Sequence, residues 1–119
     1  MKLIKKDQGQ PPKQAKQHFG QSGITKVSQE DGSQRLHVSV SHFLPGGGAE
    51  MYASPTERVY YGISGSLMVR GKNKDEYLLG PGDVLYIPPG EERSIETVGT
   101  EPATMLVIIV KLDEMMTKG

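Results

Sequence analysis

Two segments rich in glycine and proline carry most of the side chains in this 119-residue chain that could do chemistry. The first runs from Leu44 to Gly65 and contains Arg58, and the second runs from Leu79 to Arg93. The guanidinium group of arginine stays protonated in proteins and presents a planar fork of N–H donors that matches a carboxylate or a phosphate. These residue types therefore favour recognition of an anion over coordination of a metal ion.

Histidine and cysteine, the usual residues for proton transfer and metal binding, are scarce. The chain has three histidines and no cysteine, which excludes disulfides, thiolate metal sites and cysteine nucleophiles. His42 has the same parity as the apolar residues of the alternating segment Leu36–Val40, so we expect it on an inward face. There it is a candidate general acid or base, or else a hydrogen-bonded core histidine. His37 has the opposite parity, which predicts an exposed side chain.

Short strands are the elements that this sequence can build around those side chains. The chain has 15 glycines and 8 prolines, a density of breakers that long helices do not tolerate. From Ile24 onward, alternating segments separated by turn signals predict about nine strands. Among these signals, Pro45–Gly48 is expected to end the strand that contains Leu36–Val40. Strands at this spacing are typical of a sandwich or a closed barrel, and closure leaves no unpaired edge.

Charge divides the chain into two parts. Basic and acidic side chains number 14 each, so the formal net charge is zero, which argues against a nucleic-acid partner. Residues 1–26 hold six lysines against Asp7 alone, a net charge of +5, and the remainder has a net charge of −5. We expect residues 1–22 to form a basic N-terminal arm and residues 23–119 to form a single domain. His18, within the arm, is assigned no role.

Targeting and membrane-spanning patterns are absent from the sequence. The first residues lack the apolar core of a signal peptide, and the longest apolar run, Met105–Val110, is too short to cross a bilayer. We therefore expect a cytoplasmic protein with no membrane partner.

The two glycine- and proline-rich segments resemble the two signature motifs of the cupin superfamily, and the resemblance covers roughly residues 35–110. In the second motif, Gly82, Pro88 and Gly90 stand at that family's spacing. In the first, Pro45-Gly46 and the run Tyr60–Gly65 fit without a gap. The resemblance implies an all-β fold, the cupin-type double-stranded β-helix, which is a small jelly-roll barrel.

The chain departs from this family at the residues that would bind a metal ion. Typical cupins hold a divalent metal with three histidines and a glutamate. The corresponding positions here are Tyr52, Ser54, Arg58 and Arg93. A guanidinium group repels a metal ion and has no lone pair to donate to it, so we expect no metal and no cofactor. A metal-dependent cupin with non-standard ligands remains an alternative, and its candidate ligands are His37, His42, Glu50 and Glu57.

By the strand parity of the family, several of the motif side chains point into the barrel. They are Tyr52, Ser54, Arg58, Tyr60 and Arg93, together with Ile95 and Thr97. Buried arginines need anionic partners. One alternative is a small metabolite with a carboxylate or phosphate, bound by the two arginines with Ser54 and Tyr60. The other is pairing within the protein, for which the candidates are Glu50, Glu57, Glu91, Glu92 and Glu96.

These residues favour a metal-independent cupin whose cavity binds a small anionic metabolite. An enzymatic version is a lyase, isomerase or decarboxylase in which Tyr52 or His42 transfers the proton. The alternatives are a non-catalytic binding protein or sensor and a structural dimeric cupin. The resemblance implies a homodimer in each case, because isolated cupin domains commonly pair sheet against sheet.

Overall fold

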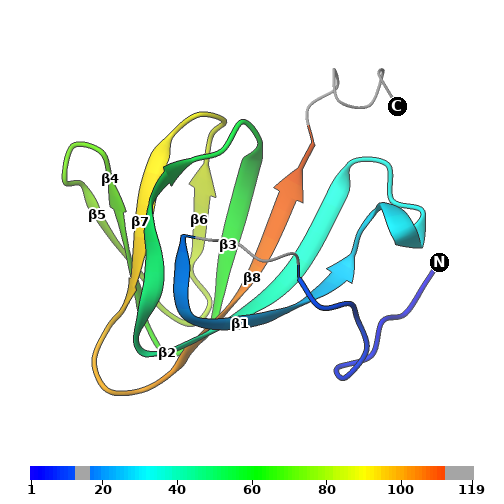
Figure 1. Cartoon of the computed structure of the whole chain (residues 1–119), viewed down its shortest axis with the longest axis horizontal. Helices are drawn as coiled ribbons and strands as arrows, with labels where there is room; N and C mark the ends of the chain where they lie inside the picture. The colour runs from blue at the N-terminus through cyan, green and yellow to red at the C-terminus, as the bar shows by residue number, and fades with distance from the viewer. Residues whose placement is uncertain (13–16, 112–119) are drawn as a thin grey trace.

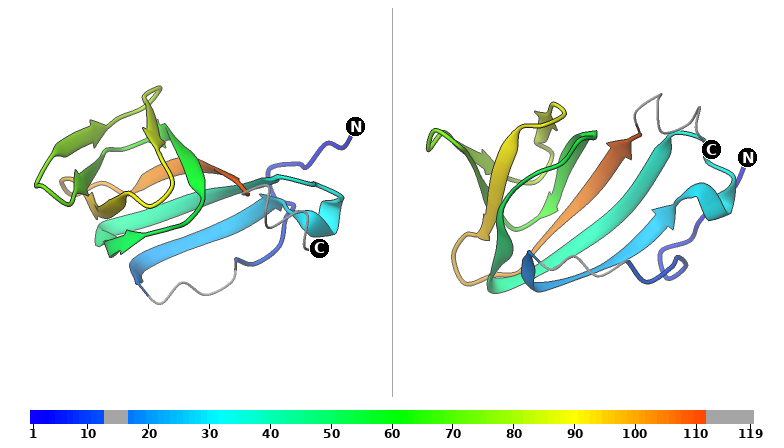
Figure 2. Two further views of the ribbon diagram at one scale, coloured as in Figure 1. Left: turned by 90° about the horizontal axis from the view of Figure 1, so that it is seen from above. Right: turned by 45° about the horizontal axis from the view of Figure 1, so that its top comes forward.

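The computed structural model describes residues 1–12 and 17–111, whose regular structure is β-strand apart from one turn of 3-10 helix (Figure 1). The strands are β1 (His18–Val27), β2 (Leu36–Ala53), β3 (Glu57–Ser64), β4 (Leu67–Gly71), β5 (Glu76–Leu79), β6 (Val84–Ile87), β7 (Glu92–Thr97) and β8 (Ala103–Val110), and the 3-10 helix is η1 (Gln29–Asp31). They form one sheet in the order β5-β4-β7-β2-β8-β3-β6, with β1 paired to β2, and the sheet curves into a barrel (Figure 2). The predicted all-β barrel is confirmed, with 8 strands in the described residues where about nine were expected.

The difference in strand number comes from β2, which is 18 residues long and continues through the segment that was expected to end it. Residues 36–43 of β2 pair with β8, and residues 48–53 pair with β7. Between these halves Gly46 has a φ of +81°, and a Cβ atom on Gly48 would collide with the carbonyl oxygen of Ile95. The prediction of a strand end is wrong here, because the glycines let one strand turn a corner and change partners.

The pairing of β2 with β8 also decides which face of β2 points inward. Phe43 is 1% exposed and shares its parity with Ser41, which is also buried, whereas Leu36 on the other face is 47% exposed. The expectation that the apolar residues of Leu36–Val40 face inward is therefore wrong. The outer face of this sheet is apolar as well, so alternation alone identifies two faces without telling which is inside.

A cluster of apolar side chains inside the curved sheet forms the core. Its most buried large members are Phe43, Tyr60, Leu67 and Val69. Burying an apolar side chain of this size contributes about 1.5–3 kcal/mol. The cluster therefore stabilises the barrel around the side chains that project inward from β2, β3, β7 and β8.

The first strand starts earlier than expected. β1 begins at His18 instead of Ile24 and pairs with β2, so the expected division of the chain at residue 22 falls inside a strand. Residues 13–16 of the expected arm and residues 112–119 of the expected domain lie outside the described residues. In the described part of the chain, no helix is long and apolar enough to cross a membrane.

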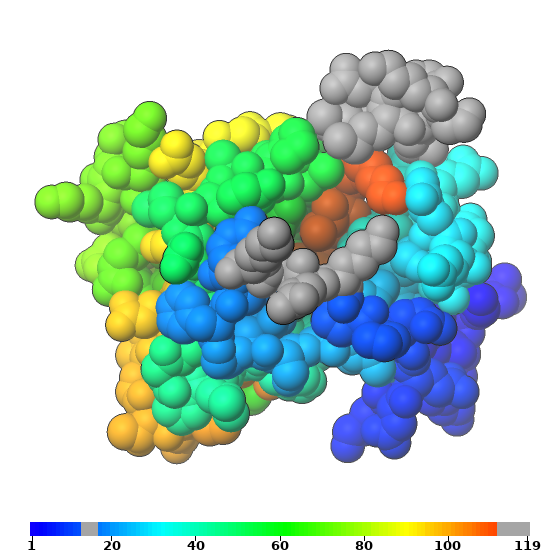
Figure 3. Space-filling model, in the orientation of Figure 1, coloured from blue at the N-terminus to red at the C-terminus, as the bar shows by residue number. Residues whose placement is uncertain are grey.

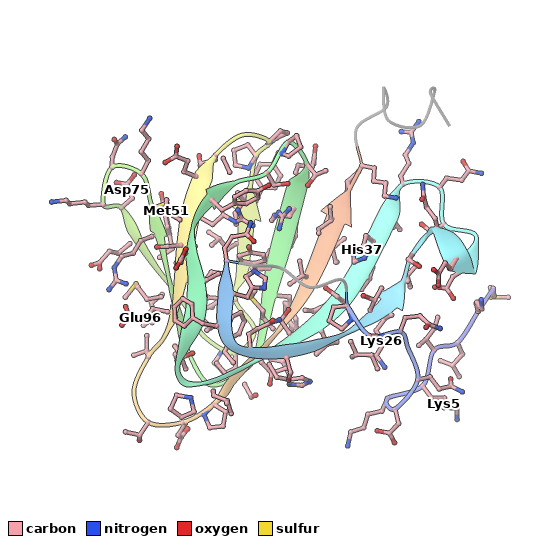
Figure 4. All side chains as sticks on the ribbon, in the orientation of Figure 1. Lys5, Lys26, His37, Met51, Asp75 and Glu96 are labelled. Atoms are coloured by element: carbon pink, nitrogen blue, oxygen red, sulfur yellow. The ribbon has the colours of Figure 1, made fainter. Side chains whose placement is uncertain are left out.

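Two contacts hold the residues before β1 against the barrel. Gln10 and Thr25 exchange backbone hydrogen bonds of 2.8 Å, which extends the sheet by one bridge beyond β1. The Lys26 ammonium group donates hydrogen bonds of 2.7, 2.7 and 2.6 Å to the backbone carbonyl oxygens of Lys5, Lys6 and Gln8 (Figure 4). Because a single charged donor satisfies three acceptors, we refer to this contact as the Lys26 clamp.

Candidate functional site

A cavity of about 490 Å³ opens into the barrel among side chains of β1, β2, β3, β7 and β8. In Figure 3, the orange strand β8 is visible at the bottom of a hollow bordered by green and cyan segments. Residues Gln10, Pro11 and Pro12, which precede β1, form part of the cavity wall. The cavity is large enough to hold a metabolite of moderate size.

Arg93, on β7, is buried in this cavity and held by two hydrogen bonds. Its side chain is 9% exposed. Its Nε donates to the Tyr60 hydroxyl at 3.1 Å, and its Nη1 donates to the backbone carbonyl of Tyr52 at 2.6 Å. The guanidinium carbon also lies over the Tyr52 ring, 5.9 Å from the centroid. These contacts fix the orientation of the guanidinium group, but no carboxylate of residues 1–12 or 17–111 forms an ion pair with it.

Arg58, on β3, lines the same cavity, and fewer of its guanidinium N–H groups form hydrogen bonds than in Arg93. Its Nη2 donates to the Thr56 hydroxyl at 3.1 Å, and its Nε is buried with no hydrogen-bond partner among the residues that the structure describes. Burial lowers the pKa of the Arg58 guanidinium, nearby Tyr60 partly offsets this effect, and the positive charge of Arg93 lowers the pKa further. The folded protein therefore holds two like charges close together in a partly desolvated space.

Carboxylates do not neutralise this pair of arginines within residues 1–12 and 17–111. The ion pairs found there join Lys2 to Asp31 and Arg70 to both Glu76 and Glu96. Of the glutamates considered from the sequence, Glu96 is paired with Arg70 at 2.6 Å on the outside of the barrel. The alternative in which the barrel's own glutamates neutralise the cavity arginines receives no support.

The other two residues expected to bind the ligand differ in position. Tyr60 is 2% exposed and lines the cavity between the arginines. The Ser54 side chain does not line it, and its hydroxyl lies 2.9 Å from the Thr56 hydroxyl that accepts from Arg58. Ser54 therefore acts on Arg58 through Thr56, as a positioning residue.

The two residues expected to transfer protons lie outside the main cavity. Tyr52 is 47% exposed and contributes its ring face and its backbone carbonyl to Arg93. His42 is exposed on the outer face of β2, with its Nδ1 atom 3.0 Å from the Thr104 hydroxyl. The inward orientation expected for His42 is wrong, for the same reason that the inward face of β2 was misassigned.

Two histidines that the sequence did not place in the site do line the cavity. Burial lowers the pKa of His18, a hydrogen bond with Gln21 raises it, and the charges of Arg93 and Arg58 lower it further. His37, expected to be exposed, is half-buried in the cavity wall (Figure 4). The signal that could have found His37 is its shared parity with Phe43, the large aromatic residue of this strand.

The residues at the family's metal positions do not fit a metal ion. Arg58 and Arg93 bring two permanent cations into the cavity, and cations repel a divalent metal. The non-standard ligands do not assemble either, because His37 lies inside the cavity while His42 and Glu50 are exposed. Across the described ranges, no group of three or more His, Cys, Asp or Glu side chains is placed to hold a metal.

Comparison with known proteins identifies the fold. The family model described as "Cupin domain" matches residues 39–109. The polyketide cyclase RemF from Streptomyces resistomycificus superposes with a TM-score of 0.83 at 19% identity, covering 92% of this chain and 79% of that one. An RmlC-like cupin from Shewanella frigidimarina NCIMB 400 gives a TM-score of 0.74 at 14% identity, covering 96% and 95%.

The protein TT1209 from Thermus thermophilus gives a TM-score of 0.66 at 25% identity, covering 76% of this chain and 82% of that one. Among curated proteins, no sequence matches this chain. These similarities support the barrel assignment and leave the ligand to be argued from the chain's own residues.

Proposed function

This chain belongs to the cupin domain family, and we propose that its barrel binds a small carboxylate- or phosphate-bearing metabolite through Arg58 and Arg93, without a metal ion. The observation that carries the proposal is the state of these two side chains. Both line one cavity, neither contacts a carboxylate of the described residues, and the buried Nε of Arg58 makes no hydrogen bond.

The energetics of buried charge support an anionic ligand. A buried cation without a partner is costly, and two neighbouring cations repel each other as well. A carboxylate or phosphate would accept the N–H groups that the two guanidinium groups present to the cavity, in charge-assisted hydrogen bonds, which are about twice as strong as neutral ones. An anion between the arginines would therefore offset the repulsion between their two positive charges.

A lyase, isomerase or decarboxylase would also need a proton-transfer group within reach of the bound anion. Of the two groups expected from the sequence, His42 lies on the outer face, and Tyr52 is largely exposed. Among the titratable side chains that line the cavity, Tyr60 accepts a hydrogen bond from Arg93, and His18 is close enough for the charges of both arginines to lower its pKa. We therefore propose anion binding as the function, with any reaction dependent on His18 or Tyr60.

A thermal-shift screen tests this proposal. A ligand that binds the folded state stabilises it by RT ln(1 + [L]/Kd), about 2.7 kcal/mol at a hundred times Kd. We expect carboxylates or sugar phosphates to raise the melting temperature, and Mn²⁺, Fe²⁺ and Zn²⁺ to have little effect. Strong stabilisation by the metals, with none by organic anions, would contradict the proposal and favour the metal-dependent alternative. No stabilisation by either class would favour a purely structural cupin.

We also propose that two copies of the chain associate through the outer face of the sheet. Two rows of apolar side chains cross β2, β8, β3 and β6 in register. One row is Val40, Leu106, Tyr61 and Val84, and the other is Val38, Ile108, Val59 and Tyr86. Tyr61, Val84 and Tyr86 are 41%, 64% and 54% exposed. A continuous apolar face of this kind is typical of an interface, and two such sheets can pack face to face.

A further inference from the structure

The floor of the cavity is apolar, although the walls on its two sides are polar. β8 runs along the floor between β3 on one side and β2 on the other (Figure 1). The side chains that β8 points into the cavity are Met105, Val107 and Ile109. A strip of three apolar side chains therefore separates the walls formed by β3 and β2.

Strand register places chemically different groups on the two sides of this strip. Ile109 lies opposite Arg58 of β3 and opposite His37 of β2. Two residues away on β8, Val107 lies opposite Tyr60 of β3 and opposite Ser39 of β2. The β3 side of the cavity thus carries a cation and a phenol, and the β2 side carries an imidazole and hydroxyl groups, while Glu30 and Lys111 also line the cavity.

The β2 side offers hydroxyl groups that are not occupied by other contacts. Ser39 and Ser41 both line the cavity, and Thr25 of β1, opposite Ser39, also lines it. Within the part of the chain that the structure describes, the hydroxyls of Ser39 and Ser41 form no hydrogen bonds. These hydroxyls are therefore available to a ligand.

The distance across the floor sets the size of a ligand that could use both sides. Neighbouring strands lie about 4.8 Å apart, so β3 and β2 are separated by about 10 Å with β8 between them. Free phosphate or a short-chain acid would occupy the arginine side and leave Val107 and Ile109 uncovered. A molecule that reaches across a cavity of about 490 Å³ needs an apolar body about the length of a substituted aromatic ring.

We infer that this cavity takes an amphipathic carboxylate whose apolar body covers Val107 and Ile109 and whose far end carries a neutral hydroxyl or carbonyl facing Ser39 and Ser41. The inference rests on the proposed function, because the carboxylate is held by Arg58 and Arg93. It narrows the ligand from any small anion to an acid with an apolar middle and a second polar group. Each methylene buried on the floor tightens binding about fourfold.

Calorimetric titration of the full chain with four probes tests the inference. The probes are 3-(4-hydroxyphenyl)propanoate, 3-phenylpropanoate, propanoate and inorganic phosphate. We expect 3-phenylpropanoate to bind at least about tenfold more tightly than propanoate, because its ring covers the floor. We expect the ring hydroxyl to tighten binding about fivefold more, through a hydrogen bond to the β2 side.

A matched variant isolates the second polar group. Combined Ser39→Ala and Ser41→Ala substitution should abolish the advantage of the hydroxyl and leave the affinity for 3-phenylpropanoate within about twofold of the unmodified chain's. Val107→Thr keeps the side-chain shape but replaces a methyl group on the floor with a hydroxyl. It should therefore weaken the binding of both aromatic probes and leave the affinity for propanoate unchanged.

The outcomes separate this inference from the proposed function. Equal or tighter binding of phosphate or propanoate overturns the inference but leaves an anion site at Arg58 and Arg93. An advantage of the ring hydroxyl that survives the double serine substitution also overturns it. If none of the four probes binds, both the inference and the proposed anion site are wrong.

Discussion

Arg58 and Arg93 share one cavity but contribute differently to the fold. Arg93 donates hydrogen bonds to the Tyr60 hydroxyl and the Tyr52 carbonyl, and so links β7 to β3 and β2. Arg58 donates to Thr56 through Nη2, but its Nε is buried with no hydrogen-bond partner in the described part of the chain. Burial and the charge of Arg93 lower the pKa of the Arg58 guanidinium. We therefore expect Arg93 to stabilise the fold without a ligand, and Arg58 to destabilise it unless an anion is bound.

Replacing each arginine by methionine should separate these roles. We expect Arg58→Met to leave the melting temperature unchanged or higher, because it removes a desolvated like charge. Arg93→Met should lower the free energy of unfolding by about 1–3 kcal/mol, because two acceptors lose their donor. Both variants should weaken binding of a carboxylate at least about tenfold.

Urea denaturation and calorimetric titration measure these two effects. Arg70→Met is the matched control, because Arg70 forms exposed ion pairs with Glu76 and Glu96 and lines none of the cavities described above. It should change the free energy of unfolding little, because its ion pairs are exposed to solvent, and leave ligand affinity unchanged. A large loss of stability in Arg58→Met would mean that Arg58 is a structural residue.

His18 should make the stability of the fold depend on pH. Its pKa in the folded protein is lowered from 6.5, chiefly by burial, so below that pH the unfolded chain binds a proton that the folded chain resists. The free energy of unfolding should therefore fall as the pH decreases through 6.5. In His18→Gln, the fall between about pH 7.5 and about pH 5.5 should be smaller. An equal or steeper fall in the variant would show that His18 is not desolvated.

At the scale of the elements, the N-terminal segment and β2 do most to build the cavity. β2 pairs with β8 in its first half and with β7 in its second. The first half carries polar residues of the cavity wall, and the second half pairs with the strand that holds Arg93. Residues 10–12 complete the wall, held by the backbone bridge to Thr25 and by the Lys26 clamp. Residues of the expected N-terminal arm thus line the cavity.

Removing the Lys26 clamp should loosen this wall. In Lys26→Met, three carbonyl groups lose a charged donor, which should lower the free energy of unfolding by about 1–2 kcal/mol. We expect faster cleavage of residues 1–12 in limited proteolysis and weaker binding of carboxylates, since part of the cavity wall is released. Lys72→Met, in an exposed turn, is the control. Unchanged proteolysis and affinity in Lys26→Met would mean that the clamp is dispensable.

Strand content and the place of the arginines were predictable, and the inward face of β2 was not. The turn residues and the motif spacing predicted the barrel, and they predicted that Arg58, Arg93 and Tyr60 point into it. In the strand that holds His37 and His42 the more apolar face points outward, and this orientation depends on pairing with β8, which lies far away in the sequence. Local periodicity does not contain that information.

The position of His18 was missed for a related reason. β1 begins with His18, Phe19 and Gly20, a stretch without clear alternation, and becomes a strand by pairing with the glycine corner of β2. A Cβ on Gly47 would collide with the carbonyl oxygen of Gly20, so the backbones of β1 and β2 approach each other closely there. This contact between distant segments brings His18 to the cavity.

At the scale of the whole molecule, the barrel has a polar cavity inside and an apolar sheet face outside. Substituting Tyr61→Lys and Val84→Lys together places two charges in one apolar row, opposite each other on β3 and β6. We expect the unmodified chain to elute as a dimer in size-exclusion chromatography with light scattering, and the double variant to elute as a monomer. A monomeric unmodified chain would contradict the proposed interface.

We propose that Arg58 and Arg93 hold an anion at positions where the resemblance to cupins implies metal ligands. A crystal structure grown with 3-phenylpropanoate and Mn²⁺ together tests it most directly. We predict carboxylate oxygens within hydrogen-bond distance of both guanidinium groups and no metal ion in the cavity. A metal ion at that position, or both arginines turned onto glutamates of the barrel with nothing between them, would contradict the claim.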